Sequence, residues 1–146
     1  MSDTINLTTS YDIRHFKDIK ELNPRLVEQK LLTKRYETLI LKGFSIDKFA
    51  IEILLSVEND VQFLIEDYLY LEDVLMKQKA FEHYSFLNDG LLQIEARNDE
   101  TIVDVTYNYC PGLNVANLVR YNERITKEMY WWWWRGIAYD LLNHLN

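Results

Sequence analysis

Three runs of β-type sequence, joined by short turn-like segments, constrain the fold of this chain more than any other feature. The runs cover Phe81–Leu87, Leu91–Asn98 and Thr101–Tyr109. Asn88-Asp89-Gly90 joins the first two, and its glycine supplies the positive φ that tight hairpin turns need. Only Asp99-Glu100 separates the second pair. Because connections this short join antiparallel neighbours, residues 81–109 are expected to form an antiparallel meander.

Helix and strand signals precede this meander. Tyr36–Phe44 mixes apolar and β-branched residues before a glycine and is predicted to be a strand. Ser45 has the character of an N-cap, and apolar residues including Ile53, Leu54 and Val57 follow it at helical spacing. The sequence therefore predicts a helix of about three turns after Ser45.

The segments between that helix and the meander, and after the meander, complete the prediction. Val61–Glu66 alternates as a short strand does, and Leu71–Gln78 indicates a second helix. Leu113–Asn122 is open between loop, strand and short helix, whereas Glu123–Leu145 is expected to be one long helix. Asn23-Pro24 is a candidate helix start. Together these elements predict an α+β fold in which an antiparallel sheet is packed by helices.

The size of the chain suits one domain. Its 146 residues contain four glycines, two prolines and no linker-like or repeated segment. We therefore expect residues 1–146 to form a single globular α+β domain.

Four consecutive tryptophans lie within the predicted C-terminal helix. Successive residues of a helix lie about 100° apart, so one face cannot bury all four. An apolar arc that also contains Ala138 assigns Trp131 and Trp134 to the core. Trp132 and Trp133 are expected on the opposite side of the helix.

Two interpretations of that opposite side stay open. Gly136 lies between the two indoles there and is expected to leave a hollow. Either a second structural layer, such as the N-terminal segment, covers this side, or it is an aromatic patch for a partner. In the second case Met129 and Tyr139 would join the two tryptophans, since aromatic residues and methionine are enriched at interface centres. The candidate contact residues are Met129, Trp132, Trp133 and Tyr139.

The acidic charge of the chain is concentrated in its middle. The chain has 23 acidic and 16 basic residues and a formal net charge of −7. Between Phe44 and Met76 stand eight acidic residues and one basic residue, Lys48, so this segment holds the whole imbalance. It is either a solvated surface or a negative field that steers a basic partner, and nucleic acid is disfavoured as a ligand. The candidate contact residues here are Glu58, Asp60, Glu66, Asp67, Glu72 and Asp73.

Patterns typical of catalytic or metal sites are missing. The sequence contains no CxxC, HExxH, GxGxxG or P-loop motif. The histidines, His15, His83 and His144, have no metal-type spacing, and His83 is interpreted as a surface or hydrogen-bonded residue rather than a general base. The single Cys110 excludes an internal disulfide framework. We therefore expect no enzymatic activity, no cofactor and no metal ion.

The compartment follows from segments that the sequence lacks. The first ten residues have neither the basic start nor the apolar core of a signal peptide. No uncharged apolar run approaches the ~20 residues that cross a bilayer. A lone cysteine suits a reducing compartment, so a cytoplasmic protein without a membrane partner is expected.

The segment Asp60–Tyr109 resembles the layout of a known class of proteins. It begins DVQFLIEDYLYLEDVL and continues through FEHYSFLNDG, LLQIEARND and TIVDVTYNY. In architecture and composition this segment, about a third of the chain, is similar to small bacterial immunity proteins of toxin–immunity systems, including contact-dependent and polymorphic toxin systems. The resemblance implies that the protein binds a cognate toxin, often a basic nuclease, and occludes its active site. No functional residue carries over from it.

Two other functions stay open at this point. The first is an acidic mimic of nucleic acid or a regulatory binding protein, which regularly spaced carboxylates along one edge would favour. The second is a small enzyme, whose sign would be a deep pocket that gathers His83 or His144 with carboxylates. The sequence leaves the oligomeric state unknown.

Overall fold

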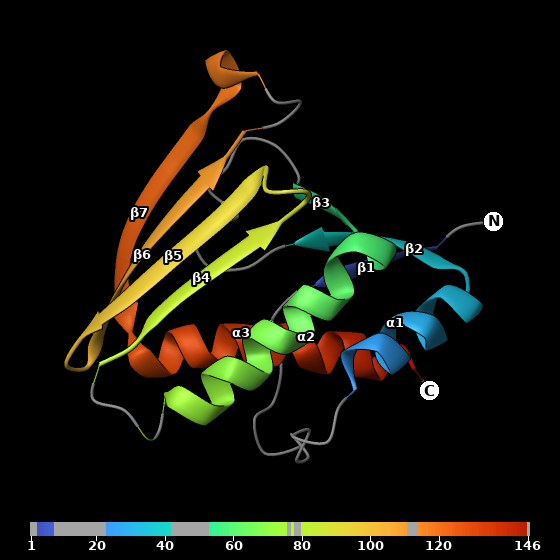
Figure 1. The fold of residues 1–146 in the computed structure, drawn as a ribbon, viewed down its shortest axis with the longest axis horizontal. Coiled ribbons are helices and arrows are strands. Elements are labelled where there is room, and N and C mark those ends of the chain that lie inside the picture. The colour runs from blue at the N-terminus through green and yellow to red at the C-terminus, as the bar shows by residue number, and fades with distance from the viewer. Residues whose placement is uncertain are drawn as a thin grey trace.

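A computed structural model describes residues 3–7, 23–41, 53–75, 77, 80–110 and 114–145 of the chain. Within these residues the chain is α+β, with two sheets and three α-helices that lie beside them (Figure 1). The predicted N-cap Ser45 and the following residues up to 52 lie outside the described ranges.

The larger sheet contains the predicted meander. Its strands are β4 (Glu82–Leu87), β5 (Leu92–Asp99), β6 (Ile102–Tyr109) and β7 (Val119–Thr126). They lie in the order β4-β5-β6-β7, and every neighbouring pair is antiparallel. Gly90 has the positive φ expected of the turn, and Asn88 and Asp89 share that backbone region. The meander prediction is confirmed. Of the segment that the sequence left open, Val115–Asn117 form a short 3-10 helix and residues 119–122 belong to β7.

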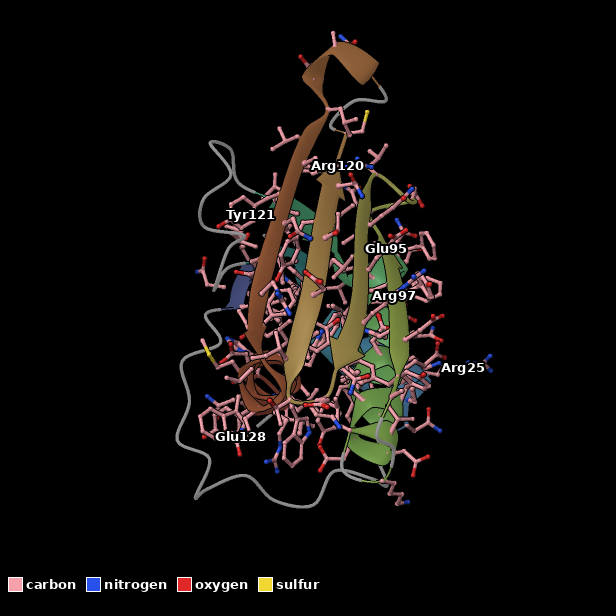
Figure 2. All side chains as sticks on the ribbon, turned by 90° about the vertical axis from the view of Figure 1, so that its left-hand side faces the viewer. Arg25, Glu95, Arg97, Arg120, Tyr121 and Glu128 are labelled. Carbon is pink, nitrogen blue, oxygen red and sulfur yellow. The ribbon has the colours of Figure 1, made fainter. Side chains whose placement is uncertain are left out.

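One face of this sheet faces the helices and the other is exposed. On β6 the buried side chains of Val103, Val105 and Tyr107 alternate with those on the opposite face. Figure 2 shows the exposed face, on which the labelled Glu95 and Arg97 lie on β5. One apolar and one polar face is the usual pattern of an antiparallel sheet.

The smaller sheet consists of β1 (Asp3–Leu7), β2 (Tyr36–Leu41) and β3 (Ile53–Ser56) in that order. β1 and β2 are parallel, and β2 and β3 are antiparallel. The strand predicted at Tyr36–Phe44 is confirmed over Tyr36–Leu41 as β2, and its residues 42–44 lie outside the described ranges. The helix predicted through Ile53 and Leu54 is wrong, because these residues belong to β3. Ile53 and Leu55 are buried and Leu54 is exposed, so this short segment alternates with a period of two.

The middle helix differs most from its prediction. α2 spans Val57–Val74 and includes Val61–Glu66, so the strand predicted for that segment is wrong. Ser56 caps the helix by accepting a hydrogen bond from Asn59 N at 3.3 Å. The buried residues of α2 include Val61, Leu64, Ile65 and Tyr68, which recur at helical spacing. Packing of this buried stripe against the core favours a helix over the strand that the local alternation predicts.

The other two helices were anticipated from the sequence. α1 spans Pro24–Thr33, and its cap Asn23 accepts from Leu26 N at 3.1 Å. α3 spans Lys127–Asn143, which confirms the C-terminal helix except for its start. Residues 123–126 belong to β7 instead, and Thr126 caps α3.

The helices connect the two sheets into one core. α2 contacts β2, β3 and β4, and α3 contacts β1, β6 and β7 (Figure 1). α1 packs on α2 and β2. No helix in the described part of the chain has both the length and the apolar character needed to cross a membrane.

Candidate functional site

Asp60, proposed above as a contact residue, is a buried structural acid. It is 1% exposed, and its two oxygens accept hydrogen bonds from Ser56 N and Asn88 N, each at 2.8 Å. Burial raises the pKa of the Asp60 carboxyl, and the two N–H donors act against that shift. Asp60 thus joins the start of α2 to the β4–β5 turn, and its assignment to an accessible acidic surface is corrected.

Replacing Asp60 by alanine is expected to destabilise the fold by about 1–3 kcal/mol, since two backbone donors lose their acceptor. Glu58→Ala, an exposed acid in the first turn of the same helix, is the control and should change stability by less than about 0.5 kcal/mol. The free energy of unfolding in urea measures both variants. Equal stabilities of the two would contradict the structural role of Asp60.

Asp67 is the centre of a second internal network. One of its oxygens lies 3.0 Å from His83 Nε2, and the other accepts from Ser85 Oγ at 2.6 Å. Because a carboxylate only accepts, Nε2 carries a hydrogen toward Asp67, and Nδ1 lies 2.6 Å from the Tyr130 hydroxyl, which donates to it when the imidazole is neutral. The ring of Trp134 meets the imidazole edge-on, with centroids 5.2 Å apart. This network joins α2, β4 and α3.

The network lacks the arrangement of a catalytic site. Ser85 donates to the carboxylate of Asp67 rather than to the imidazole of His83, so the serine–histidine pair of a nucleophilic site is not formed here. His83 is 2% exposed, and it lines neither of the two described cavities, which lie around Trp131 and around Lys34. His83 is therefore hydrogen-bonded as expected, but it is buried rather than at the surface.

Glu72, another nominated acid, also faces a neighbouring helix. It accepts from Trp131 Nε1 at 2.7 Å and lies 3.7 Å from Arg135 Nε. The Arg135 guanidinium lies 4.6 Å from the centre of the Trp131 ring. Trp131 is half-buried in this cluster, so its assignment to the inner core is corrected.

Among the nominated acids, Glu58, Glu66 and Asp73 are exposed. Asp73 pairs with Lys77 at 2.7 Å, one helical turn further on. Three of the six nominated acids thus lie on the accessible surface of α2, and the other three serve internal bonds.

The nominated aromatic residues of α3 are also divided. Met129 and Trp132 are exposed, and Tyr139 is half-buried. Trp133 is 1% exposed and packs edge-on against Tyr107 of β6, so its assignment to the outer side is corrected. The buried arc of α3 is turned toward Trp133, because the helix contacts β1 as well as the larger sheet. Gly136, expected to leave a surface hollow, is buried as well.

Four exposed aromatic side chains that were not identified from the sequence lie on α2 and β4. Phe63 and Tyr70 belong to α2, and Tyr84 and Phe86 lie on the face of β4 opposite the buried His83 and Ser85. All four are between 39% and 54% exposed. We call these four residues the β4-edge aromatic residues.

α2 and β4 run side by side in opposite directions, so the α2 pair and the β4 pair lie on either side of the same sheet edge. Hydrogen bonds join α2 to His83, Ser85 and Glu82 of β4, and Asp60 also accepts from Asn88 in the turn that follows. β4 is an edge strand of its sheet, and it lies at the right of the sheet in Figure 2.

The signal for two of these four residues was present in the sequence. Along FEHYSFL, buried residues at 81, 83, 85 and 87 alternate with exposed ones, which places Tyr84 and Phe86 outside. Recognising Phe63 required α2 to be identified as a helix.

Comparison of the chain with protein-family models, with curated proteins and with solved structures gave no match. Within the described ranges, no three histidine, cysteine, aspartate or glutamate side chains stand close enough to share a metal ion.

Proposed function

We propose that this protein is an immunity-type inhibitor, which binds a basic protein toxin in the cytoplasm and occludes its active site. The observation that supports this most is the outer surface of α2. The helix contains six acidic and no basic residues, and its exposed face combines Glu58 and Glu66 with Phe63 and Tyr70. Aromatic anchors next to charges of one sign suit a protein partner of the opposite charge.

The alternatives fit this surface less well. A mimic of nucleic acid needs a row of exposed carboxylates, whereas half of the nominated acids face inward. An enzyme needs reacting groups that substrate can reach, whereas His83 and its partners are packed between α2, β4 and α3.

Co-expression with the product of the neighbouring gene tests the proposal. That gene is expected to encode a secreted toxin, the two proteins should co-purify, and growth should be restored. A locus of metabolic genes alone, or a toxin that keeps full activity in a molar excess of this protein, would contradict it.

Reversing the charge of Glu66 is expected to slow association with that toxin. Glu66→Lys should lower the association rate constant by about threefold to tenfold at low salt, and the difference should shrink as ionic strength rises. Glu37→Lys, an exposed acid of β2, is the matched control because it changes the net charge equally. Stopped-flow measurements at several salt concentrations check this, and equal slowing by both variants would mean that only net charge matters.

A further inference from the structure

The exposed edge of β4 retains backbone groups that can pair with another strand. Glu82 accepts a hydrogen bond from the Tyr70 hydroxyl at its backbone oxygen, and Asn88 donates its backbone N–H to α2 as well. Backbone groups alternate between the two sides of a strand, so Tyr84 and Phe86 also direct their N–H and C=O groups away from β5. Within the described residues, no strand lies beside them on that side.

The opposite edge of the same sheet, formed by β7, has the charged side chains that usually prevent an edge strand from pairing with another strand. β7 has three charged residues, Arg120, Glu123 and Arg124, and Glu123 faces inward, where it accepts from the Tyr107 hydroxyl at 2.7 Å. Charged and inward-pointing charged side chains discourage further pairing. β4 has one charged residue, Glu82, no lysine or proline, and an uninterrupted register with β5. Between Glu82 and Asn88, whose outward backbone groups bond to α2, β4 is therefore the edge that is open to an additional strand.

The surroundings of this edge define the chemistry of the added strand. Side chains of a strand beside β4 alternate between the outer face, near Tyr84 and Phe86, and the inner face, above α2. On α2 the residues Phe63, Glu66 and Tyr70 follow one another at three- and four-residue intervals and so form one stripe. The inward-facing side chains of a strand above this stripe would contact the carboxylate of Glu66 and, on either side of it, the rings of Phe63 and Tyr70.

We infer that an extended segment of the partner protein adds to β4 as a fifth strand of the larger sheet. This inference rests on the proposed function and names the part of the partner that the surface recognises. The segment has a lysine or arginine facing Glu66 and apolar residues on either side that face Phe63 and Tyr70. Main-chain hydrogen bonds provide affinity in such strand addition, and alternate side chains provide specificity.

A second copy of this chain fits the edge less well. A symmetric pairing of β4 with itself would bring two α2 helices together, and this helix contains no basic residue. The exposed Glu66 side chains of the two copies would then approach each other, and like charges at an interface are unfavourable.

Selection from a displayed library of random peptides about ten residues long, roughly the length of a strand with its flanks, tests the inference on the whole protein. Enriched peptides should contain a basic residue flanked by apolar and β-branched ones. Phe86→Lys and Glu66→Lys should each weaken their binding at least tenfold. Leu118→Lys, at an equally exposed apolar position beside β7, should leave binding unchanged.

The backbone pairing has its own readout. In an enriched peptide, N-methylation at every second residue should abolish binding, and methylation of the intervening residues should be tolerated. Hydrogen exchange of the Tyr84 and Phe86 amides should slow when the peptide binds. Methylation effects without this period, or slowed exchange only elsewhere, would overturn the inference.

The inference that a partner strand adds to β4 is overturned if the library yields no enriched peptides, or if the enriched peptides bind all three variants equally. A dimer in sedimentation experiments that Phe86→Lys dissociates also overturns it, because the edge would then pair with a second copy. A toxin that this protein neutralises while Phe86→Lys and Glu66→Lys retain full affinity overturns strand addition alone. If library peptides bind beside β4 as expected but no toxin is found that this protein neutralises, the proposed function alone is overturned.

Discussion

Trp133→Ala is expected to lower the free energy of unfolding by about 3–5 kcal/mol, the usual cost of removing a large aromatic side chain from a core. Trp133 is 1% exposed. Its ring meets that of Tyr107 with centroids 6.1 Å apart and that of Trp134 at 5.3 Å. For a chain of this size the loss corresponds to a decrease in Tm of roughly 10 °C.

Trp132→Ala is the control for this prediction, because its side chain is 39% exposed one residue earlier in the same helix. It is expected to cost less than about 1 kcal/mol. Urea unfolding followed by circular dichroism compares the two without depending on the fluorescence of the remaining tryptophans. Similar costs for both variants would mean that α3 is packed differently around its axis.

The tryptophan run illustrates what periodicity can establish. The pattern correctly assigns Trp134, Ile137, Ala138 and Leu141 to one buried arc. It does not fix the edges of that arc, which depend on how many elements surround the helix. Because β1 also contacts α3, the buried side extends to Trp133, and Trp131 moves to a half-buried position beside Glu72.

The meander could be predicted because its signals are local. Alternating side chains and the glycine of the turn lie within a few residues of one another, and neighbouring strands are also neighbours in sequence. In α2 the local signals conflict, since Val61, Phe63 and Ile65 alternate as in a strand while Val61, Leu64 and Ile65 form a helical stripe. Packing against β2, β3 and β4 decides between them, and these contacts are distant in sequence.

The roles of the acidic residues were least predictable, because long-range partners determine them. Asp60 bonds to Asn88, 28 residues away, and Glu72 bonds to Trp131, 59 residues away. Nothing in the local sequence distinguishes these acids from Glu66, which remains at the surface. The charge of the segment could therefore be counted from the sequence, but its exposed part could not.

The protein is expected to lose stability steeply above pH 10, because Tyr68, Tyr107 and Tyr130, three of its ten tyrosines, are at most 1% exposed and are buried as neutral phenols. Burial raises the pKa of Tyr68, Tyr107 and Tyr130 above the ordinary value of 10.0. A group whose pKa is raised by folding holds its proton longer in the folded state. Its contribution to stability is therefore complete below pH 10 and is lost as the pH rises toward the folded-state pKa.

Each of these tyrosines should remove about 1.4 kcal/mol per pH unit in that range, and the three together about 4 kcal/mol. Tyr107→Phe keeps the ring but removes the hydroxyl that donates to Glu123 at 2.7 Å. It is expected to cost about 1 kcal/mol at pH 8 and to lessen the alkaline slope by about a third. Urea unfolding between pH 8 and pH 11 measures both effects. The same slope in Tyr107→Phe and in the unaltered protein would mean that the Tyr107 hydroxyl meets water in the folded state.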